Sequence, residues 1–166
     1  MANYPALLLI FAGMRILMVC LGNICRSPLA EGILKAKAAS AGFNWTVESA
    51  GTNRYHTGEA PHRLSQKIAM QNGIDISGHR ARTFVKEDMA DYDRIFSMAA
   101  DVLEDMRSIS GNKYDETKVE LLMNELHPGL NEDVPDPYYG GEEGYHLVFE
   151  MMKQACDSII EKYATQ

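Results

Sequence analysis

Apolar residues gather along this chain in two alternating kinds of segment. Four short segments have the character of strands: 15–21, 45–51, 92–98 and 118–123. The first is a continuous apolar run, which is typical of a strand buried on both faces of a parallel sheet. In four other segments, apolar positions recur at helical spacing: 27–40, 61–73, 101–111 and 142–163. This alternation predicts a single α/β domain in three αβα layers, with a four-stranded parallel sheet in the middle.

The helical segment 27–40 has a recognisable beginning and end. Ser27 followed by Pro28 fits an N-cap and a first helical position, and Gly42 fits the end of the helix. In parallel sheets, ligands bind at the carboxyl ends of the strands, near a switch in strand order. The connection between the first strand and this helix is therefore where we expect the chemistry.

Composition narrows the class of protein. The chain has 166 residues, enough for one domain with a sizeable core. A formal net charge of −7 argues against a broad nucleic-acid footprint, but it leaves room for positive potential at one site. We expect no nucleic-acid partner, no stable membrane insertion, and a monomer or weak dimer.

The cysteines favour a reducing compartment. Cys20, Cys25 and Cys156 are too few for a disulfide framework, which suits a cytoplasmic location. Zinc sites usually need four ligands, and no second Cys/His pair at ligand spacing occurs, since 56–62 holds only two scattered histidines. We expect no metal and no other cofactor.

The apolar N-terminus stands apart from this pattern. Residues 5–13 are far shorter than the roughly 20 residues that a membrane-spanning helix needs, and they lack the preceding Lys or Arg of a signal peptide. We interpret 1–13 as an extension produced by an over-long gene prediction, with Met14 as the true start and 14–166 as the functional domain. An ordered extension and an atypical export signal remain the alternatives.

The loop after the first strand combines features of an anion site. Backbone N–H groups at a strand-to-helix turn form a concave cradle for anions. Gly22 and Asn23 tolerate unusual backbone angles, and Arg26 can grip two phosphate oxygens with its planar fork. Cys20 ends the strand at the base of this cradle, where a thiolate is stabilised for attack on a bound phosphoryl group. The simpler interpretation of Cys20 is a buried strand residue.

Two motifs resemble a known family. CLGNICRSP at 20–28 is similar to the signature of the low-molecular-weight protein tyrosine phosphatases, and DPYYG at 136–140 is similar to their second motif. The likeness also includes VESAG, HRAR and KVELL, and so covers the chain from Met14 to about Tyr163. It implies a phosphate-binding loop after the first strand and metal-independent hydrolysis of phosphotyrosine in a protein substrate, through a phosphocysteine intermediate. The loop residues that would bind the substrate are Leu21, Gly22, Asn23, Ile24 and Cys25.

The second motif supplies the expected proton donor. Asp136 lies in a Pro- and Gly-rich loop, where catalytic groups often sit, and would act first as general acid and then as general base. An aspartate before proline is also a common turn residue. Tyr138 and Tyr139 would wall the cleft and stack on an aromatic substrate, and the resemblance places Tyr55 on the opposite wall. Each tyrosine has the alternative of being an exposed loop residue.

The resemblance also implies supporting roles. Ser27, Ser49 and His79 would form a buried network that braces Asn23, and Ser27 would in addition hydrogen-bond the Cys20 thiolate. A reversible Cys20–Cys25 disulfide would protect the nucleophile from peroxide, although Cys25 as a packing residue remains an alternative.

The sequence departs from the family after the third strand. Ala99 stands where the family usually has aspartate before a helix. We expect a weaker or shifted helix cap there, using Ser97 or Asp101, without loss of catalysis.

Three other functions compete with this one. A thiol-dependent arsenate reductase would need two further neighbouring cysteines, whereas Cys156 stands alone on a helix face. A protein arginine phosphatase shares the scaffold, but the resemblance associates it with Thr at the position of Ile24. A non-catalytic phosphopeptide-binding module would not need Cys20 and Asp136 together.

Overall fold

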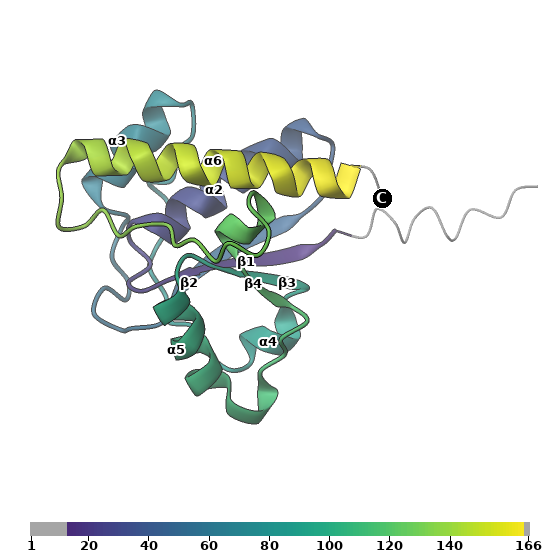
Figure 1. The fold of residues 1–166 in the computed structure, drawn as a ribbon. Coiled ribbons are helices and arrows are strands. Elements are labelled where there is room, and N and C mark those ends of the chain that lie inside the picture. Colours follow the sequence, from purple (N-terminus) through teal and green to yellow (C-terminus); the bar gives the residue numbers. More distant parts are fainter. Residues whose placement is uncertain (1–12, 165–166) are drawn as a thin grey trace, which may run out of the picture.

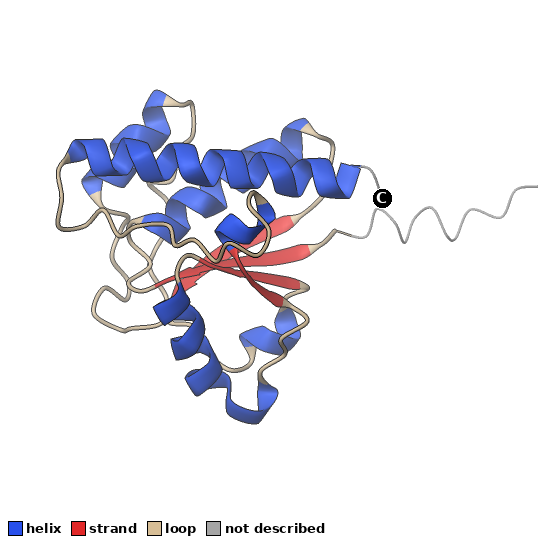
Figure 2. Cartoon of the chain, viewed as in Figure 1, coloured by secondary structure: helices blue, strands red, loops and turns tan. Residues whose placement is uncertain are grey.

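The computed structural model describes residues 13–164, and within them four parallel strands form the central sheet (Figures 1 and 2). The strands are β1 (Arg15–Cys20), β2 (Thr46–Gly51), β3 (Arg94–Ser97) and β4 (Val119–Leu121). They lie in the order β2-β1-β3-β4. Each strand falls inside one of the four predicted strand segments, so the predicted α/β fold with a four-stranded parallel sheet is confirmed.

Helices cover both faces of the sheet. Their bounds are α2 (Arg26–Ser40), α3 (Arg63–Gln71), α4 (Asp88–Asp91), α5 (Ala100–Ser110) and α6 (Glu142–Ala164). Helices α2, α3 and α6 lie on one side, and α4 and α5 on the other (Figure 1). Short 3-10 turns follow α5 and β4, at Gly111–Lys113 and Leu122–Glu125. Helix α4 was not predicted, because four residues are too few to show a helical period. Most of the predicted N-terminal extension, residues 1–12, lies outside the described residues.

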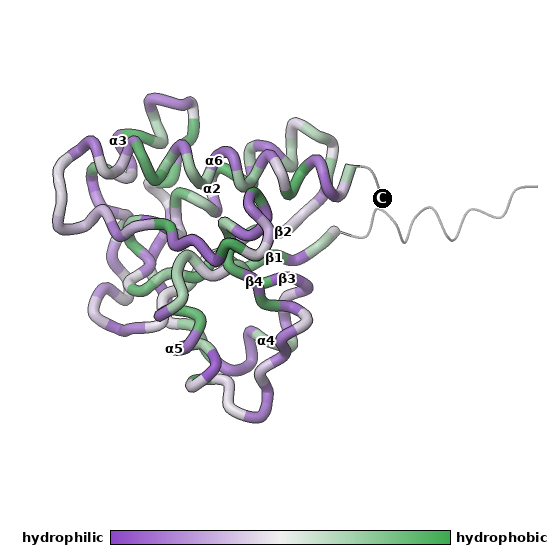
Figure 3. Tube along the Cα trace, in the orientation of Figure 1, coloured by the Kyte–Doolittle hydropathy of each residue, from purple (hydrophilic) through white to green (hydrophobic). Residues whose placement is uncertain are grey.

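Strand β1 shows why the sheet needs both helical layers. Ile16 and Met18 pack into the core beneath α2 and α6, whereas Leu17 and Val19 pack into the core on the side of α4 and α5. All four are fully buried. Successive side chains of a strand point to opposite faces, so a continuous apolar run is needed when both faces are covered. Figure 3 shows this hydrophobic stretch in green at the centre of the molecule.

The strand order positions the carboxyl end of β1. The chain passes from β1 through α2 to β2 on one side, and later returns to β3 on the other side of β1. Connections that leave a strand in opposite directions open a crevice at its carboxyl end. Cys20 is the last residue of β1 and therefore lies at this switch point.

The predicted cap at Ser27 is wrong. Helix α2 already begins at Arg26, and its N-cap residue Cys25 makes no side-chain capping hydrogen bond. The Ser27 hydroxyl instead contacts Cys20 and Asn23 inside the molecule. The end of the helix agrees with the prediction, since Gly42 follows it with a φ of 80° that favours glycine.

The start of α5 is capped from a distant segment. As expected, the side chain of Ala99 supplies no cap, and Asp101 accepts a hydrogen bond from the Val102 N–H. Ser97 does not cap the helix, because its hydroxyl donates to the carbonyl of Ala99. The first helical N–H, that of Ala100, donates to Oδ1 of Asp133 at 2.9 Å, a residue that sequence reasoning did not single out.

Candidate functional site

The Cys20 thiol is enclosed by the loop that follows it. The side chain is 2% exposed, and its Sγ accepts a hydrogen bond from the backbone N–H of Asn23 at 3.2 Å. The Ser27 Oγ lies 3.0 Å from the same sulfur. The loop folds back over the end of β1. The groups that can stabilise a Cys20 thiolate, the Asn23 N–H and the Ser27 hydroxyl, therefore come from residues that directly follow it in the chain.

Asn23 holds that turn in an unusual conformation. Its φ of 57° lies in the left-handed region, and its side chain is fully buried. The amide Nδ2 donates to Ser27 Oγ at 2.7 Å and to Ser49 Oγ at 3.0 Å. The amide Oδ1 lies 3.1 Å from His79 Nε2. Asn23 is therefore hydrogen-bonded to each of the three residues of the predicted bracing network.

The network extends to residues that the sequence did not reveal. Glu31 Oε1 accepts from the Ser49 hydroxyl at 2.9 Å, and the Arg82 N–H donates to Asn23 Oδ1 at 3.0 Å. Burial lowers the pKa of His79, while Glu31 opposes this shift. A neutral imidazole can still donate from Nε2 to the Asn23 oxygen, which can only accept. The bracing therefore does not require a charged histidine.

Gly51 permits the loop to pass close to β2. A Cβ atom at this position would lie 2.8 Å from the Leu21 carbonyl oxygen and 2.9 Å from the Asn23 nitrogen. Both contacts are with backbone, which cannot move aside without unfolding the loop. A glycine at the end of the neighbouring strand was the available sequence signal, because glycine marks close backbone approach.

Arg26 links the loop to the segment that carries Asp136. Its guanidinium is 5% exposed, and Nη1 donates to the Val134 carbonyl at 3.0 Å. Nη2 lies 3.6 Å from Asp136 Oδ2. The other carboxylate oxygen of Asp136 accepts from the Tyr138 N–H at 3.0 Å. These contacts hold a cation and a carboxyl group at one edge of the same opening.

A cavity of about 170 Å³ lies above this loop and contains almost the whole predicted site. Its lining includes these predicted residues: Cys20, Leu21, Gly22, Ile24, Cys25, Arg26, Tyr55, Asp136, Tyr138 and Tyr139. Asn23 was predicted to bind substrate but does not line the cavity, because its side chain is hydrogen-bonded in the bracing network. The predicted supporting residues Ser27, Ser49 and His79 also lie outside the lining. Asn53 and His56 also line the cavity and were missed, because an isolated loop Asn or His carries no distinctive spacing.

The walls of the cavity are far more exposed than its floor. Tyr55 and Tyr139 are 86% and 91% exposed, and Tyr138 is 41% exposed. The Tyr138 and Tyr139 rings meet edge to face with their centroids 5.0 Å apart. His56 contacts Tyr138, and its Nδ1 pairs with Glu59 at 2.8 Å. The tyrosines thus stand beside the opening without being fixed by surrounding core.

The other two cysteines differ from Cys20 in their surroundings. Burial raises the pKa of Cys25 to about 11, and its Sγ lies 3.5 Å from the Tyr145 hydroxyl. Cys156 is a fully buried residue of α6, and burial raises its pKa to about 12. The expected core position of Cys156 is confirmed. A Cys20–Cys25 disulfide stays a prediction, since all three cysteines are free thiols.

Residues 13–164 contain no cluster of three or more His, Cys, Asp or Glu side chains placed to hold a metal ion.

In the described part of the chain, no helix is both long enough and apolar enough to cross a membrane.

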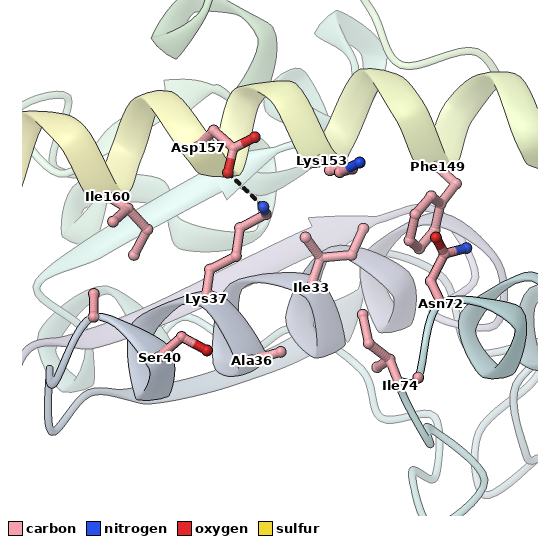
Figure 4. Close-up of a pocket in the computed structure, with 12 residues that line it drawn as sticks. Ile33, Ala36, Lys37, Ser40, Asn72, Ile74, Phe149, Lys153, Asp157 and Ile160 are labelled. Carbon is pink, nitrogen blue, oxygen red and sulfur yellow. Dashed lines mark hydrogen bonds and ion pairs between the residues drawn. The ribbon is translucent and has the colours of Figure 1, made fainter.

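A second cavity, of about 680 Å³, lies between α2 and α6 (Figure 4). Ile33, Ile74 and Phe149 supply apolar lining, and an ion pair between Lys37 and Asp157 crosses it. Although larger, it contains none of the predicted site residues and no cysteine. The smaller cavity is the candidate site because it combines a thiol, a guanidinium and a carboxyl group, and not because of its size.

Known proteins resemble this chain in sequence. The family model described as low molecular weight phosphotyrosine protein phosphatase matches residues 15–166. The low molecular weight protein-tyrosine-phosphatase YfkJ of Bacillus subtilis is 36% identical over 147 residues, 87% of this chain and 92% of its own. The human low molecular weight phosphotyrosine protein phosphatase is 36% identical over 150 residues, 89% of this chain and 94% of its own.

Solved structures agree with the sequence comparison. The crystal structure of YfkJ from Bacillus subtilis superposes with a TM-score of 0.84 at 34% identity, over 93% of this chain and 96% of that one. A Drosophila arginine phosphatase superposes with a TM-score of 0.82 at 28% identity, over 90% of this chain and 98% of that one. On its sequence and its fold, the chain belongs to the low-molecular-weight phosphotyrosine protein phosphatase family, a family of hydrolases.

Proposed function

We propose that this chain hydrolyses phosphotyrosine in protein substrates, with Cys20, Arg26 and Asp136 as its catalytic residues. The observation that carries the proposal is the meeting of these three side chains at one cavity of about 170 Å³. A thiol nucleophile, a planar cation for phosphate oxygens and a carboxyl proton donor are the groups that a phosphate ester requires.

In the first step the Cys20 thiolate attacks phosphorus and the bond to the tyrosine oxygen breaks. Arg26 and the loop amides hold the phosphoryl oxygens, whose charge they stabilise as the bond breaks. Protonated Asp136 gives its proton to the departing phenolate, which would otherwise leave poorly. The products are the free tyrosine side chain and a phosphocysteine.

In the second step water attacks the phosphocysteine. Asp136, now ionised, accepts a proton from the water, and Cys20 leaves as a thiolate. The Ser27 hydroxyl, 3.0 Å from the sulfur, supports that departure because Asn23 already donates to its oxygen, so that its own proton can point toward Sγ. Inorganic phosphate is released, and no metal takes part in either step.

The lining of the cavity favours an aromatic substrate over phosphoarginine. Tyr55, Tyr138 and Tyr139 stand at the opening, and Ile24 contributes apolar surface to the floor. A phenyl ring gains stacking energy from such walls. A guanidinium also stacks on aromatic rings but needs polar partners for its N–H groups, and the Ile24 side chain offers none. Phosphoarginine remains the second candidate, because a neighbour named as an arginine phosphatase shares the fold.

The test compares phosphate release from a phosphotyrosine peptide and a phosphoarginine peptide of the same sequence, in the presence of a chelator. Cys20→Ser serves as the blank. Faster release from phosphotyrosine, abolished in the variant, is the expected result. Faster release from phosphoarginine would overturn the substrate class, and release by Cys20→Ser would overturn the covalent mechanism. Phosphate binding without release from either peptide would identify a binding module.

We also infer a cytoplasmic location. The proposed chemistry requires Cys20 as a free thiol, and the three cysteines are unpaired in the structure. Reducing compartments maintain that state.

A further inference from the structure

Asp133 connects the segment that carries the proposed proton donor to a neighbouring helix. It lies three residues before Asp136, and its Oδ1 accepts the N–H of Ala100 at the start of α5, at 2.9 Å. The N-cap residue Ala99 has no side-chain acceptor of its own. The first free N–H of α5 therefore obtains its acceptor from the loop rather than from the helix.

The next residue extends this attachment to two more elements. Val134 is fully buried, and its N–H donates to the Met98 carbonyl, just after β3, at 2.7 Å. Its own carbonyl accepts from Arg26 Nη1 of α2 at 3.0 Å. Residues 133–134 are thus hydrogen-bonded to α5, to the end of β3 and to α2.

This attachment lies one residue from the proton donor. Only Pro135 separates Val134 from Asp136, and the proline ring restricts the backbone rotation between them. The hydrogen bond from the Tyr138 N–H to Oδ1 orients the Asp136 carboxyl group. In this orientation Oδ2 faces Arg26. A shift of 133–134 would therefore move the donor oxygen relative to the cavity.

We propose that Asp133 is a positioning residue: one hydrogen bond both caps α5 and holds Asp136 over the phosphate-binding loop. This inference rests on the proposed function, because it assumes that Asp136 protonates the leaving group. Misplacement of a proton donor by a fraction of an ångström slows a reaction without abolishing binding.

The test uses two substrates that differ in how much they need the proton. Phenyl phosphate releases a weakly acidic phenol, whereas 4-nitrophenyl phosphate releases a much more acidic one, so only the first depends strongly on the donor. For Asp133→Ala we expect kcat/KM for phenyl phosphate to fall about three- to tenfold, and for 4-nitrophenyl phosphate less than about twofold. Asp133→Asn should stay near wild type, because an amide oxygen also accepts at a helix start.

Two further variants separate positioning from plain helix capping. Adding Ala99→Asp to Asp133→Ala supplies a local acceptor at an N-cap residue whose φ of −156° and ψ of 162° suit one. We expect the thermal midpoint to recover while the ratio of kcat/KM between the two substrates does not. Glu132→Ala, which removes a neighbouring carboxylate paired with His127, should leave the ratio unchanged and so control for charge.

The outcomes are distinguishable from failure of the proposed function. Asp136→Asn should show the same preference for 4-nitrophenyl phosphate in a stronger form. If it does and Asp133→Ala does not, or if Asp133→Ala slows both substrates equally, the positioning role is overturned and the proposed mechanism stands. If Asp136→Asn shows no such preference, Asp136 is not the donor and both proposals fall. The proposal is judged on the ratio of kcat/KM between the two substrates, whatever effect Ala99→Asp has on the thermal midpoint.

Discussion

The floor and the rim of the small cavity are built in opposite ways. The floor includes the buried residues directly beneath it. Asn23 and Ser27 are fully buried there and Arg26 nearly so, and each hydrogen-bonds to an element distant in sequence. On the rim, Tyr55 and Tyr139 are almost entirely exposed. The groups proposed to carry the chemistry are thus held by the folded core, whereas those proposed to meet the substrate are held mainly by their own loops.

This difference predicts different consequences of substitution. Floor residues should affect the rate, because a buried network fixes the geometry on which phosphoryl transfer depends. Rim residues should affect recognition, because exposed side chains contribute contact area but little orientation. Pairs of like residues in the two regions allow the difference to be tested directly.

The largest effect is expected from the two arginines. Arg26→Ala should lower kcat/KM for a phosphotyrosine peptide by about 10³-fold, since it removes a charge-assisted clamp on the phosphoryl oxygens. Arg54→Ala removes an exposed arginine between the lining residues Asn53 and Tyr55 and should change kcat/KM by no more than about threefold. Steady-state kinetics on both variants measures this, and similar losses would show that floor and rim do not differ.

Substitution of Asn23 should likewise lower activity more than substitution of Asn53, but by less than the loss of Arg26. Asn23→Ala should lower kcat by about 10²-fold. Alanine cannot make the buried side-chain hydrogen bonds of Asn23, and it tolerates the left-handed backbone conformation less well. Asn53→Ala, which removes only an acceptor for the Tyr55 N–H, should leave kcat within about twofold. An Asn23→Ala enzyme with normal kcat would show that the network does not position the loop.

A rim tyrosine should change KM rather than kcat. Tyr139→Ala should raise KM for a phosphotyrosine peptide about threefold to tenfold, because one aromatic contact with the substrate is lost. Inorganic phosphate should inhibit this variant as strongly as it inhibits the wild type. Tyr139→Phe keeps the ring and should retain the wild-type KM. If inhibition by phosphate weakened as well, Tyr139 would belong functionally to the floor.

The smallest expected effect is a pH dependence of stability from the floor network. Burial lowers the pKa of His79 in the folded state, and Glu31 opposes this from the same network while Lys35 and Arg80 add to it. A histidine whose pKa is lowered by folding makes its full contribution to the free energy of unfolding at pH values above its unfolded pKa of about 6.5. That contribution declines as the pH falls through about 6.5 toward the folded pKa.

Urea midpoints measured between pH 5 and pH 8 would detect this decline. The wild type should lose more stability over that interval than His79→Gln, which cannot titrate. His127→Gln removes a half-exposed histidine paired with Glu132 and serves as the control. Parallel curves for wild type and His79→Gln would mean that His79 titrates alike in the folded and unfolded chain.

Most of the successful predictions came from signals carried by neighbouring residues. The first strand was predicted from a continuous apolar run, because burial on both faces demands apolar residues, and the other three from short strand-like segments between helical ones. The spacing of Cys20, Asn23 and Arg26 located the loop, since a strand-to-helix turn is a local structure. The prediction failed at Ser27, where Ser before Pro suggested a cap but the hydroxyl is used by the loop instead.

Other contacts could not be assigned because they join distant segments. Glu31, Arg82 and Gly51 support the loop from three separate segments. Gly51 and Arg82 end the VESAG and HRAR motifs, but neither motif indicates which backbone or side-chain atoms these residues contact. Asp133 caps a helix that begins 33 positions earlier in the chain. Such partners are selected by proximity after folding, which local residue preferences do not encode.

The sequence by itself determined the alternation of strands and helices, the reactive loop at the end of the first strand, and the residue types available for chemistry. Only the tertiary structure decided which buried groups brace that loop and how the segment before Asp136 is attached. The physical reason is that apolar periodicity and turn preferences act over a few residues, whereas a buried polar group takes whichever partner the packed elements bring within hydrogen-bonding distance.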